Sequence, residues 1–135
     1  MHRHTGIVTD NIINLRNFYC SVFGFIVVYS KTEREYLSDL TSVKSASAQI
    51  IKLSKNGQTV IELLKFAKNK RRKSVELNTK GITHLALTVK NVNNVIGECV
   101  INGGKLVGKV ITTEQVIVAF IQDPDGNKIE IVQEL

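Results

Sequence analysis

Four ionisable side chains recur in pairs along the chain, and their chemistry suits a metal ion. His4 and His84 lie 80 residues apart, and Glu62 and Glu130 lie 68 residues apart. Two imidazoles and two carboxylates form a mixed nitrogen and oxygen donor set that suits zinc, nickel, cobalt, manganese or iron. A structural zinc site would favour cysteine thiolates instead. These four residues therefore predict one divalent ion with coordination positions left for water or substrate.

A structural role is the simpler alternative for any one of these histidines. The stretch THLALTVKN is predicted to be a strand, whose alternation places His84 on the same face as Ala86 and Thr88. A buried histidine there needs only a hydrogen-bond partner. Recurrence of all four residues at matching positions favours the metal site, because two carboxylates facing one cleft repel each other unless a cation lies between them. His2 is an alternative ligand, although the repeat selects His4.

An internal repeat relates the four residues to one another. The segment HTGIVTDN from His4 overlays HLALTVKN from His84 at a shift of 80 residues. The segments TVIELL and NKIEIV overlay at a shift of 68 and place Glu62 on Glu130. The second copy is therefore 12 residues shorter, and the piece it lacks corresponds to the polar segment 33–45. We expect that segment to be a loop with one helical turn over the cleft.

Each copy is predicted to contain one helix after its first strand. Asn11 and Asn91 are expected to cap the helix N-termini, and Gly24 and Gly103 mark the C-termini. Spacings of three and four residues place the apolar side chains on one side of each helix. These stripes are Ile12, Leu15, Phe18, Tyr19 and Val22 in the first helix, and Val92, Val95, Ile96, Cys99 and Val100 in the second.

Three further strands follow each helix, with turns at Asn56–Gly57 and at DPDG, residues 123–126. The expected strands are 25–31, 47–53 and 59–66 in the first copy, and 105–111, 115–121 and 128–133 in the second. The fold class is thus α+β, with two tandem βαβββ modules, at about 1–66 and 81–135, joined by a basic connector at 67–80. We expect a single domain, residues 1–135, in which the two sheets form a half-barrel with helices outside and a cleft inside.

Composition is that of an ordinary globular chain of 135 residues, with 43% hydrophobic and 22% charged residues. The sequence contains no apolar run near the roughly 18 residues that span a bilayer, and its start lacks the pattern of a secretory signal. We therefore expect a cytoplasmic protein. Cys20 and Cys99 have no metal-type spacing and are expected to be reduced, buried thiols.

The net charge of +6 comes largely from one run, residues 68–73, which holds five of the 18 basic residues. The other 13 nearly balance the 12 acidic residues. No aromatic residue interrupts the run, and no nucleic-acid-binding motif accompanies it, so we interpret it as a solvated connector. A surface that attracts an anionic small molecule is the first alternative, and nucleic-acid binding is the weaker one.

With these residues identified, the chain resembles the vicinal oxygen chelate superfamily over almost its whole length. This group includes glyoxalase I, methylmalonyl-CoA epimerase, fosfomycin- and bleomycin-resistance proteins and extradiol dioxygenases. The segments that carry the resemblance are HTGIVTDN, NFYCSVFGF, VIELL, GITHLALTVKN and AFIQDPDGNKIEIVQ. The resemblance implies metal ligands at His4, Glu62, His84 and Glu130, a small-molecule substrate, and a cleft that is often built across a homodimer.

The fourth ligand, Glu62, resembles the glyoxalase I and epimerase branch, whereas dioxygenases and fosfomycin-resistance enzymes use three ligands. That branch implies a lyase or isomerase in which a metal stabilises an enediolate while Glu130 or Glu62 moves a proton between carbons. The arginine by which glyoxalase I binds the glutathione carboxylate is replaced by Val8. The additional acid of epimerases is absent from 47–53, which contains Gln49 and Lys52 instead.

The substrate is therefore predicted only as a small oxygenated molecule, with an anionic one left open. The alternatives are a binding protein of the bleomycin-resistance type, which sequesters a ligand without catalysis, and a ring-cleaving dioxygenase-like enzyme.

Overall fold

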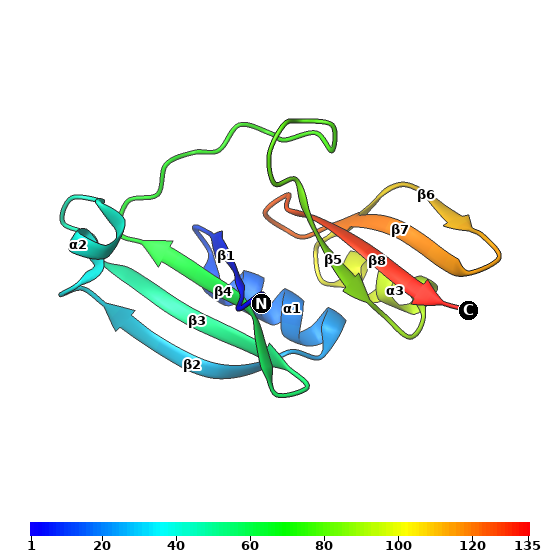
Figure 1. Ribbon diagram of the computed structural model, residues 1–135, viewed down its shortest axis with the longest axis horizontal. Coiled ribbons are helices and arrows are strands. Elements are labelled where there is room, and N and C mark those ends of the chain that lie inside the picture. Colours follow the sequence, from blue (N-terminus) through cyan, green and yellow to red (C-terminus); the bar gives the residue numbers. More distant parts are fainter. The chain divides into compact units, whose positions relative to one another are not determined.

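A computed structural model describes residues 1–135, apart from the side chain of Thr59, and divides them into two compact units. The first unit comprises Met1–Cys20 and Gly24–Arg71, and the second comprises Ser21–Phe23 and Arg72–Leu135. Figure 1 shows that each unit is built on one curved, open sheet. We describe each unit by itself.

The first unit is a four-stranded sheet in the order β1-β4-β3-β2. β1 pairs with β4 in parallel, and the other two pairings are antiparallel. Its elements in chain order are β1 Thr5–Val8, α1 Ile12–Phe23, β2 Ile26–Glu33, α2 Leu37–Thr41, β3 Ala48–Lys55 and β4 Gln58–Phe66.

The second unit repeats this topology with strand order β5-β8-β7-β6 and the same pattern of one parallel and two antiparallel pairings. Its elements are β5 His84–Thr88, α3 Val92–Ile101, β6 Lys105–Thr112, β7 Val116–Gln122 and β8 Lys128–Glu134. The predicted α+β fold with two tandem βαβββ modules is confirmed, and the predicted strands agree with the observed ones to within two residues.

Strand register confirms the repeat residue by residue. Gly6 lies opposite Glu62 in the β1–β4 pair, and Ala86 lies opposite Glu130 in the β5–β8 pair. Gly6 and Ala86 differ by 80 positions, and the two glutamates differ by 68. Both shifts read from the sequence are therefore shifts between equivalent positions of the two sheets.

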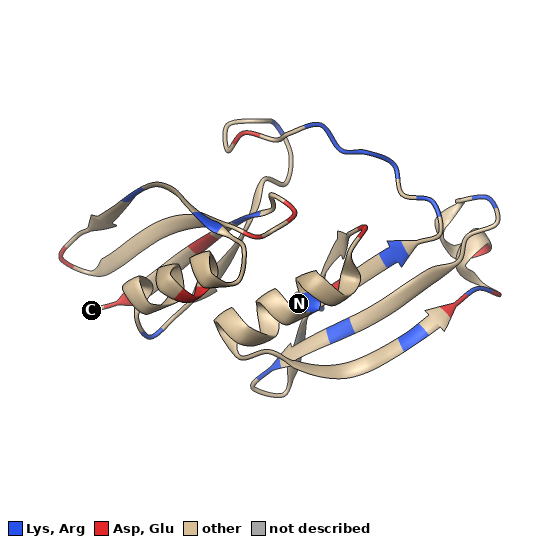
Figure 2. Cartoon of the chain, turned by 180° about the vertical axis from the view of Figure 1, so that it is seen from behind, with Lys and Arg blue, Asp and Glu red and all other residues tan. Residues whose placement is uncertain are grey.

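The helices cover one face of each sheet, as Figure 2 shows from behind. In the first unit the whole predicted stripe of α1 is buried, together with Ile61 and Leu63 of β4. The stripe of α3 is less complete: Val92 and Cys99 are fully buried, but Val100 is 57% exposed. The prediction for Val100 was wrong because successive helix residues point about 100° apart, so burial of Cys99 turns its neighbour outward.

Both helices begin and end as predicted. The side chains of Asn11 and Asn91 accept hydrogen bonds from the backbone N–H groups of Asn14 and Asn94, at 3.2 and 2.9 Å. Gly24 ends α1 with φ of 68°, a backbone conformation that glycine adopts without a steric penalty.

The connector at 67–80, all of which the structure describes, forms no helix or strand, and its basic side chains are exposed. The basic residues lie along it in Figure 2. Its first part is held by Asn69, whose amide donates to the Thr9 carbonyl at 2.9 Å and to Asp10 at 2.7 Å. These observations agree with the solvated connector that the charge run predicts. Among the described residues, no helix has the length and apolar character needed to cross a membrane.

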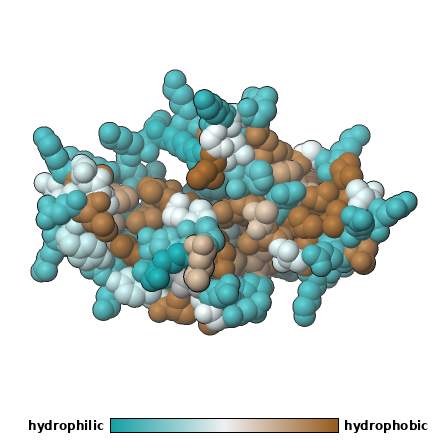
Figure 3. Space-filling view, viewed as in Figure 1, coloured by the Kyte–Doolittle hydropathy of each residue, from teal (hydrophilic) through white to brown (hydrophobic). Residues whose placement is uncertain are grey.

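Exposed apolar side chains lie on the outermost strands of both sheets. On β2, Ile26 is 62% exposed and Val28 is 52% exposed, and on β6, Ile111 is 53% exposed. Figure 3 shows apolar side chains at the surface beside long polar ones. Outer strands of this kind offer unpaired backbone groups and apolar side chains to a partner.

Both cysteines are free thiols, of which Cys99 is fully buried and Cys20 is half-buried. The prediction of reduced thiols agrees with this, but full burial is observed for Cys99 alone. Burial raises the pKa of the Cys99 thiol from 9.0 to about 11, although a hydrogen bond to the Gln122 carbonyl acts in the opposite direction.

This pKa predicts a loss of stability at alkaline pH. The unfolded chain releases the Cys99 proton above about pH 9, whereas the folded chain retains it to about pH 11, so the free energy of unfolding falls across that window. Cys99→Ala removes this component. Chemical denaturation at intervals from pH 8 to 11 should show a steeper decline for the wild-type protein, and parallel profiles would contradict the assignment.

Candidate functional site

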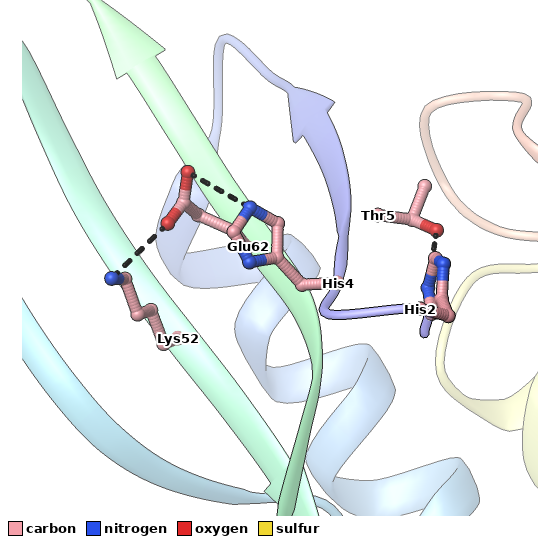
Figure 4. A network of polar contacts seen from close by, with 5 residues as sticks. All are labelled: His2, His4, Thr5, Lys52 and Glu62. Atoms are coloured by element: carbon pink, nitrogen blue, oxygen red, sulfur yellow. Dashed lines mark hydrogen bonds and ion pairs between the residues drawn. The ribbon is translucent and has the colours of Figure 1, made fainter.

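The first unit brings His4 and Glu62 together on the face of the sheet opposite α1. Gly6 on β1 is the register partner of Glu62 on β4, and the His4 imidazole reaches across so that its Nε2 lies 3.7 Å from Glu62 Oε1 (Figure 4). His4 was predicted to lie within the strand, but β1 begins at Thr5. The imidazole is thus carried by the segment that enters the strand.

The second unit repeats the arrangement with His84 and Glu130. His84 is the first residue of β5, and its Nε2 lies 3.5 Å from Glu130 Oε2. Its ring packs edge-on against Phe120 of β7, with the ring centroids 5.1 Å apart. Thr83 Oγ1 lies 3.0 Å from His84 Nδ1. The ring is therefore held on two sides while Nε2 faces the carboxylate.

Alternation along the strands explains why both glutamates leave the core. Ile61 and Leu63, on either side of Glu62, are fully buried, and so are Ile129 and Ile131 on either side of Glu130. The glutamate side chains themselves remain 16% and 29% exposed. Each carboxylate is therefore partly desolvated yet still open to a ligand.

The two distances fit a shared metal better than a direct hydrogen bond. Nitrogen and oxygen atoms 3.5 and 3.7 Å apart exceed the usual hydrogen-bond length of about 2.7–3.2 Å. Two ligand atoms, each about 2.1 Å from a tetrahedral ion, lie about 3.4 Å apart. Each pair can therefore accept an ion with little movement. Within the described residues, neither unit alone gathers a third histidine, cysteine, aspartate or glutamate around its pair.

Lys52 is a functional candidate whose position the sequence analysis noted without assigning it a role. It lies opposite Glu62 in the β3–β4 register, and its Nζ is 3.4 Å from Glu62 Oε2 (Figure 4). The Lys52 ammonium also lies 5.0 Å from the centroid of the Tyr29 ring. A sequence signal did exist, because the 68-residue shift that aligns the glutamates aligns Lys52 with Phe120.

A hollow of about 720 Å³ lies beside the pair in the first unit. Its size is within the range of small-molecule sites. Its lining residues are Met1, His2, Arg3, His4, Lys52, Gln58 and Val60. His2 lines the hollow but lies against Thr5, with 3.4 Å between Nε2 and Oγ1, so His4 is the imidazole that contacts Glu62. Arg3, which the sequence analysis did not single out, adds a second cationic side chain.

The short helix α2 packs on the same sheet face, beyond Lys52. Its Leu37 forms a buried cluster with Ala46, Ala48 and Ile50, against which Tyr29 packs. Ala48 and Ile50 alternate with Lys52 along β3, so they share its face. The segment 33–45 therefore folds as the single helical turn that the sequence predicts, and it adds an apolar wall on the side of the sheet that carries Glu62.

Tyr29 joins this wall to the charged residues. Its hydroxyl donates a hydrogen bond to the Glu33 carboxylate, and that bond, with some burial and nearby negative charge, raises the pKa of Tyr29 to about 12. The phenol therefore stays neutral at physiological pH, and its ring faces the Lys52 ammonium.

The turn before β8 fixes the strand that carries Glu130. Asp123 is only 2% exposed, and its Oδ1 accepts hydrogen bonds from the backbone N–H groups of Asp125 and Asn127, at 3.0 and 2.9 Å. Its Oδ2 accepts a further bond from the Asn127 amide at 2.9 Å. The DPDG turn identified in the sequence is thus held by its own first side chain.

Solved structures with the same fold come from several organisms. A glyoxalase family protein from Bacillus cereus has a TM-score of 0.91 at 20% identity, covering 99% of this chain and 93% of that one. A glyoxalase I mutant from Zea mays has a TM-score of 0.66 at 17% identity, and the match covers 96% of this chain but 43% of the maize chain.

Sequence comparison extends the similarity beyond the fold. A probable lactoylglutathione lyase from Synechocystis sp. is 27% identical over 132 residues, which cover 96% of this chain and 92% of the relative. Residues 3–131 match the model of the Glyoxalase/Bleomycin resistance protein/Dioxygenase superfamily. The chain therefore belongs to the glyoxalase/bleomycin resistance protein/dioxygenase superfamily.

Proposed function

We propose that the protein is a divalent-metal-dependent lyase or isomerase of the glyoxalase type, which moves a proton beside a carbonyl group of a small oxygenated substrate. The observation that supports this is the matched pair of His–Glu contacts, His4 with Glu62 and His84 with Glu130, at equivalent positions of the two repeats. A structural histidine requires no carboxylate beside it, and the repetition of both partners favours a shared ligand.

In this proposal the two pairs, from one chain or from two copies, hold one ion. The donor set fits zinc, nickel, cobalt, manganese or iron. When bound, such an ion polarises the substrate carbonyl and stabilises the enediolate, which lowers the barrier by several kcal/mol. The family also contains non-catalytic members, so metal content is the first property to measure.

Glu130 is the better candidate for the general base, although Glu62 is the alternative. Both oxygens of Glu62 face a partner, His4 on one side and Lys52 on the other. Glu130 is contacted by His84 through Oε2. In this assignment Glu130 takes the proton from the carbon next to the carbonyl and returns it to the neighbouring carbon. The hydrophobic residues on either side of Glu130 fix the strand and hence the direction of its carboxylate.

The substrate of the Synechocystis relative, as its name gives it, is a useful starting probe. Lactoylglutathione lyase chemistry acts on a hemithioacetal, which carries the required proton next to a carbonyl. Val8 stands where the family resemblance would place an arginine for the glutathione carboxylate. We therefore propose that a smaller molecule than the glutathione adduct is the preferred substrate.

Pairing of units and location in the cell follow the same line of argument. Exposed apolar side chains on β2 and β6 favour burial against another unit, in the same chain or in a homodimer. Two free thiols suit a reducing compartment such as the cytoplasm.

Metal analysis distinguishes this enzyme from a binding protein that uses the hollow without a metal. Protein purified without chelator should contain about one ion per chain, measured by mass spectrometry of the metal. His4→Ala and His84→Ala should each weaken zinc binding at least about tenfold, because each removes an inner ligand. His2→Ala is the matched control and should leave the affinity unchanged. A chain that stays empty in micromolar zinc or nickel would instead favour sequestration of a ligand.

Glu130→Gln tests the proton transfer directly. The amide keeps the shape of the side chain but cannot act as a base, so solvent deuterium should no longer enter the substrate carbon. The assay is proton NMR in D₂O with dihydroxyacetone and with hemithioacetals of methylglyoxal, made with glutathione and with 2-mercaptoethanol. Glu134→Gln, an exposed change on the same strand, serves as control. Exchange at the wild-type rate in Glu130→Gln would exclude Glu130 as the base.

A further inference from the structure

The two repeats differ at one position beside the candidate ligands. The residue opposite Glu130 in the β7–β8 register is Phe120, whose ring packs against His84. The equivalent residue opposite Glu62 is Lys52, whose ammonium lies 3.4 Å from the carboxylate. One half of the repeat therefore places an aromatic ring beside its His–Glu pair, and the other half places a positive charge there.

Positive charge dominates the hollow on the lysine side. Arg3 and Lys52 line it together with the donors of Gln58, His2 and His4, and none of the described lining residues carries a carboxylate. The carboxylate that lies nearest to this group is Glu62, which already contacts Lys52 and His4. Loss of Glu62 to another cation would leave two ammonium or guanidinium groups facing the hollow with no fixed counter-charge.

We propose that Lys52 and Arg3 form a binding site for an oxyanion of the substrate, a carboxylate or a phosphate, and that Lys52 becomes available to it when a divalent ion takes Glu62. The inference rests on the proposed function, because it requires Glu62 to be a metal ligand. It extends that function by assigning an anionic substrate and the two side chains that bind its charge.

Competition for Glu62 gives this site its coupling to the metal. An ion bound to Glu62 withdraws the carboxylate charge that attracts Lys52, and it also repels the ammonium directly. The lysine stem is flexible and half-buried, so the ammonium can turn toward the hollow without a change in the sheet. The Tyr29 ring, 5.0 Å from Nζ, keeps the ammonium near the hollow by a cation–π contact. Metal and oxyanion should therefore strengthen each other's binding.

Lys52→Met tests the competition, because it removes the charge and keeps most of the stem. Zinc titration by calorimetry should show affinity about three- to tenfold higher in Lys52→Met than in the wild-type protein, since the ion no longer displaces an ammonium from Glu62. Lys65→Met removes the same charge from the neighbouring strand at an exposed position and should leave zinc affinity unchanged. Circular dichroism and the Tm confirm that each variant is folded.

Oxyanion binding gives the second and decisive measurement. Methylphosphonate and propionate are titrated into zinc-loaded and metal-free protein and followed by amide chemical shifts of residues 50–62. Zinc-loaded wild-type protein should bind one of them at least about tenfold more tightly than zinc-loaded Lys52→Met, and Lys52→Arg should retain part of the affinity. The preferred probe identifies the oxyanion as phosphate-like or carboxylate-like. Metal-free wild-type and Lys52→Met proteins should differ little.

Each failure has a separate meaning. Equal oxyanion affinity of zinc-loaded wild-type and Lys52→Met proteins would overturn the oxyanion site and leave the metal-dependent function standing. Failure of the wild-type protein to bind zinc, nickel, cobalt, manganese or iron would overturn the proposed function, and this inference with it.

Discussion

Negative charge on the partly buried face of a sheet is the constraint on which the rest of the site depends. Glu62 and Glu130 stand between fully buried isoleucine and leucine side chains, so neither can swing into bulk water without disturbing the strand. A carboxylate in that position needs a cation or strong hydrogen-bond donors. The chain supplies an imidazole to each glutamate and an ammonium to one of them. A divalent ion would satisfy the same requirement more fully, because it supplies two charges at about 2 Å.

The repeat turns this local requirement into a pair of sites that started alike and then diverged in one detail. Topology, helix caps and the His–Glu pair are common to both units. The difference is confined to the middle strand, where Lys52 and Phe120 occupy equivalent positions. A symmetric site would bind a symmetric ligand, whereas a substrate with one charged end and one reacting carbon suits one half with a cation and one half with an apolar wall.

Sequence patterns predicted the fold nearly to the residue because the repeat provided two independent readings of each element. Alternation of buried and exposed residues around Glu62 and Glu130 was sufficient to place both carboxylates outside the core. The role of Lys52 was missed because a cross-strand contact depends on register, and register was visible only after both repeats had been aligned through their last strands. Arg3 was missed because it lies before β1, where alternation does not apply. The exposure of Val100 depends on how the last turn of α3 faces the sheet, which spacing alone left ambiguous.

The central claim is that one ion is held by both pairs, and the environment of the bound metal tests it most directly. X-ray absorption at the zinc edge should show two imidazole nitrogens and additional oxygen ligands at about 2.0–2.2 Å, with no sulfur. Loss of one imidazole in either His4→Ala or His84→Ala should follow. A spectrum with a single imidazole, or with a thiolate from Cys20, would contradict the shared site.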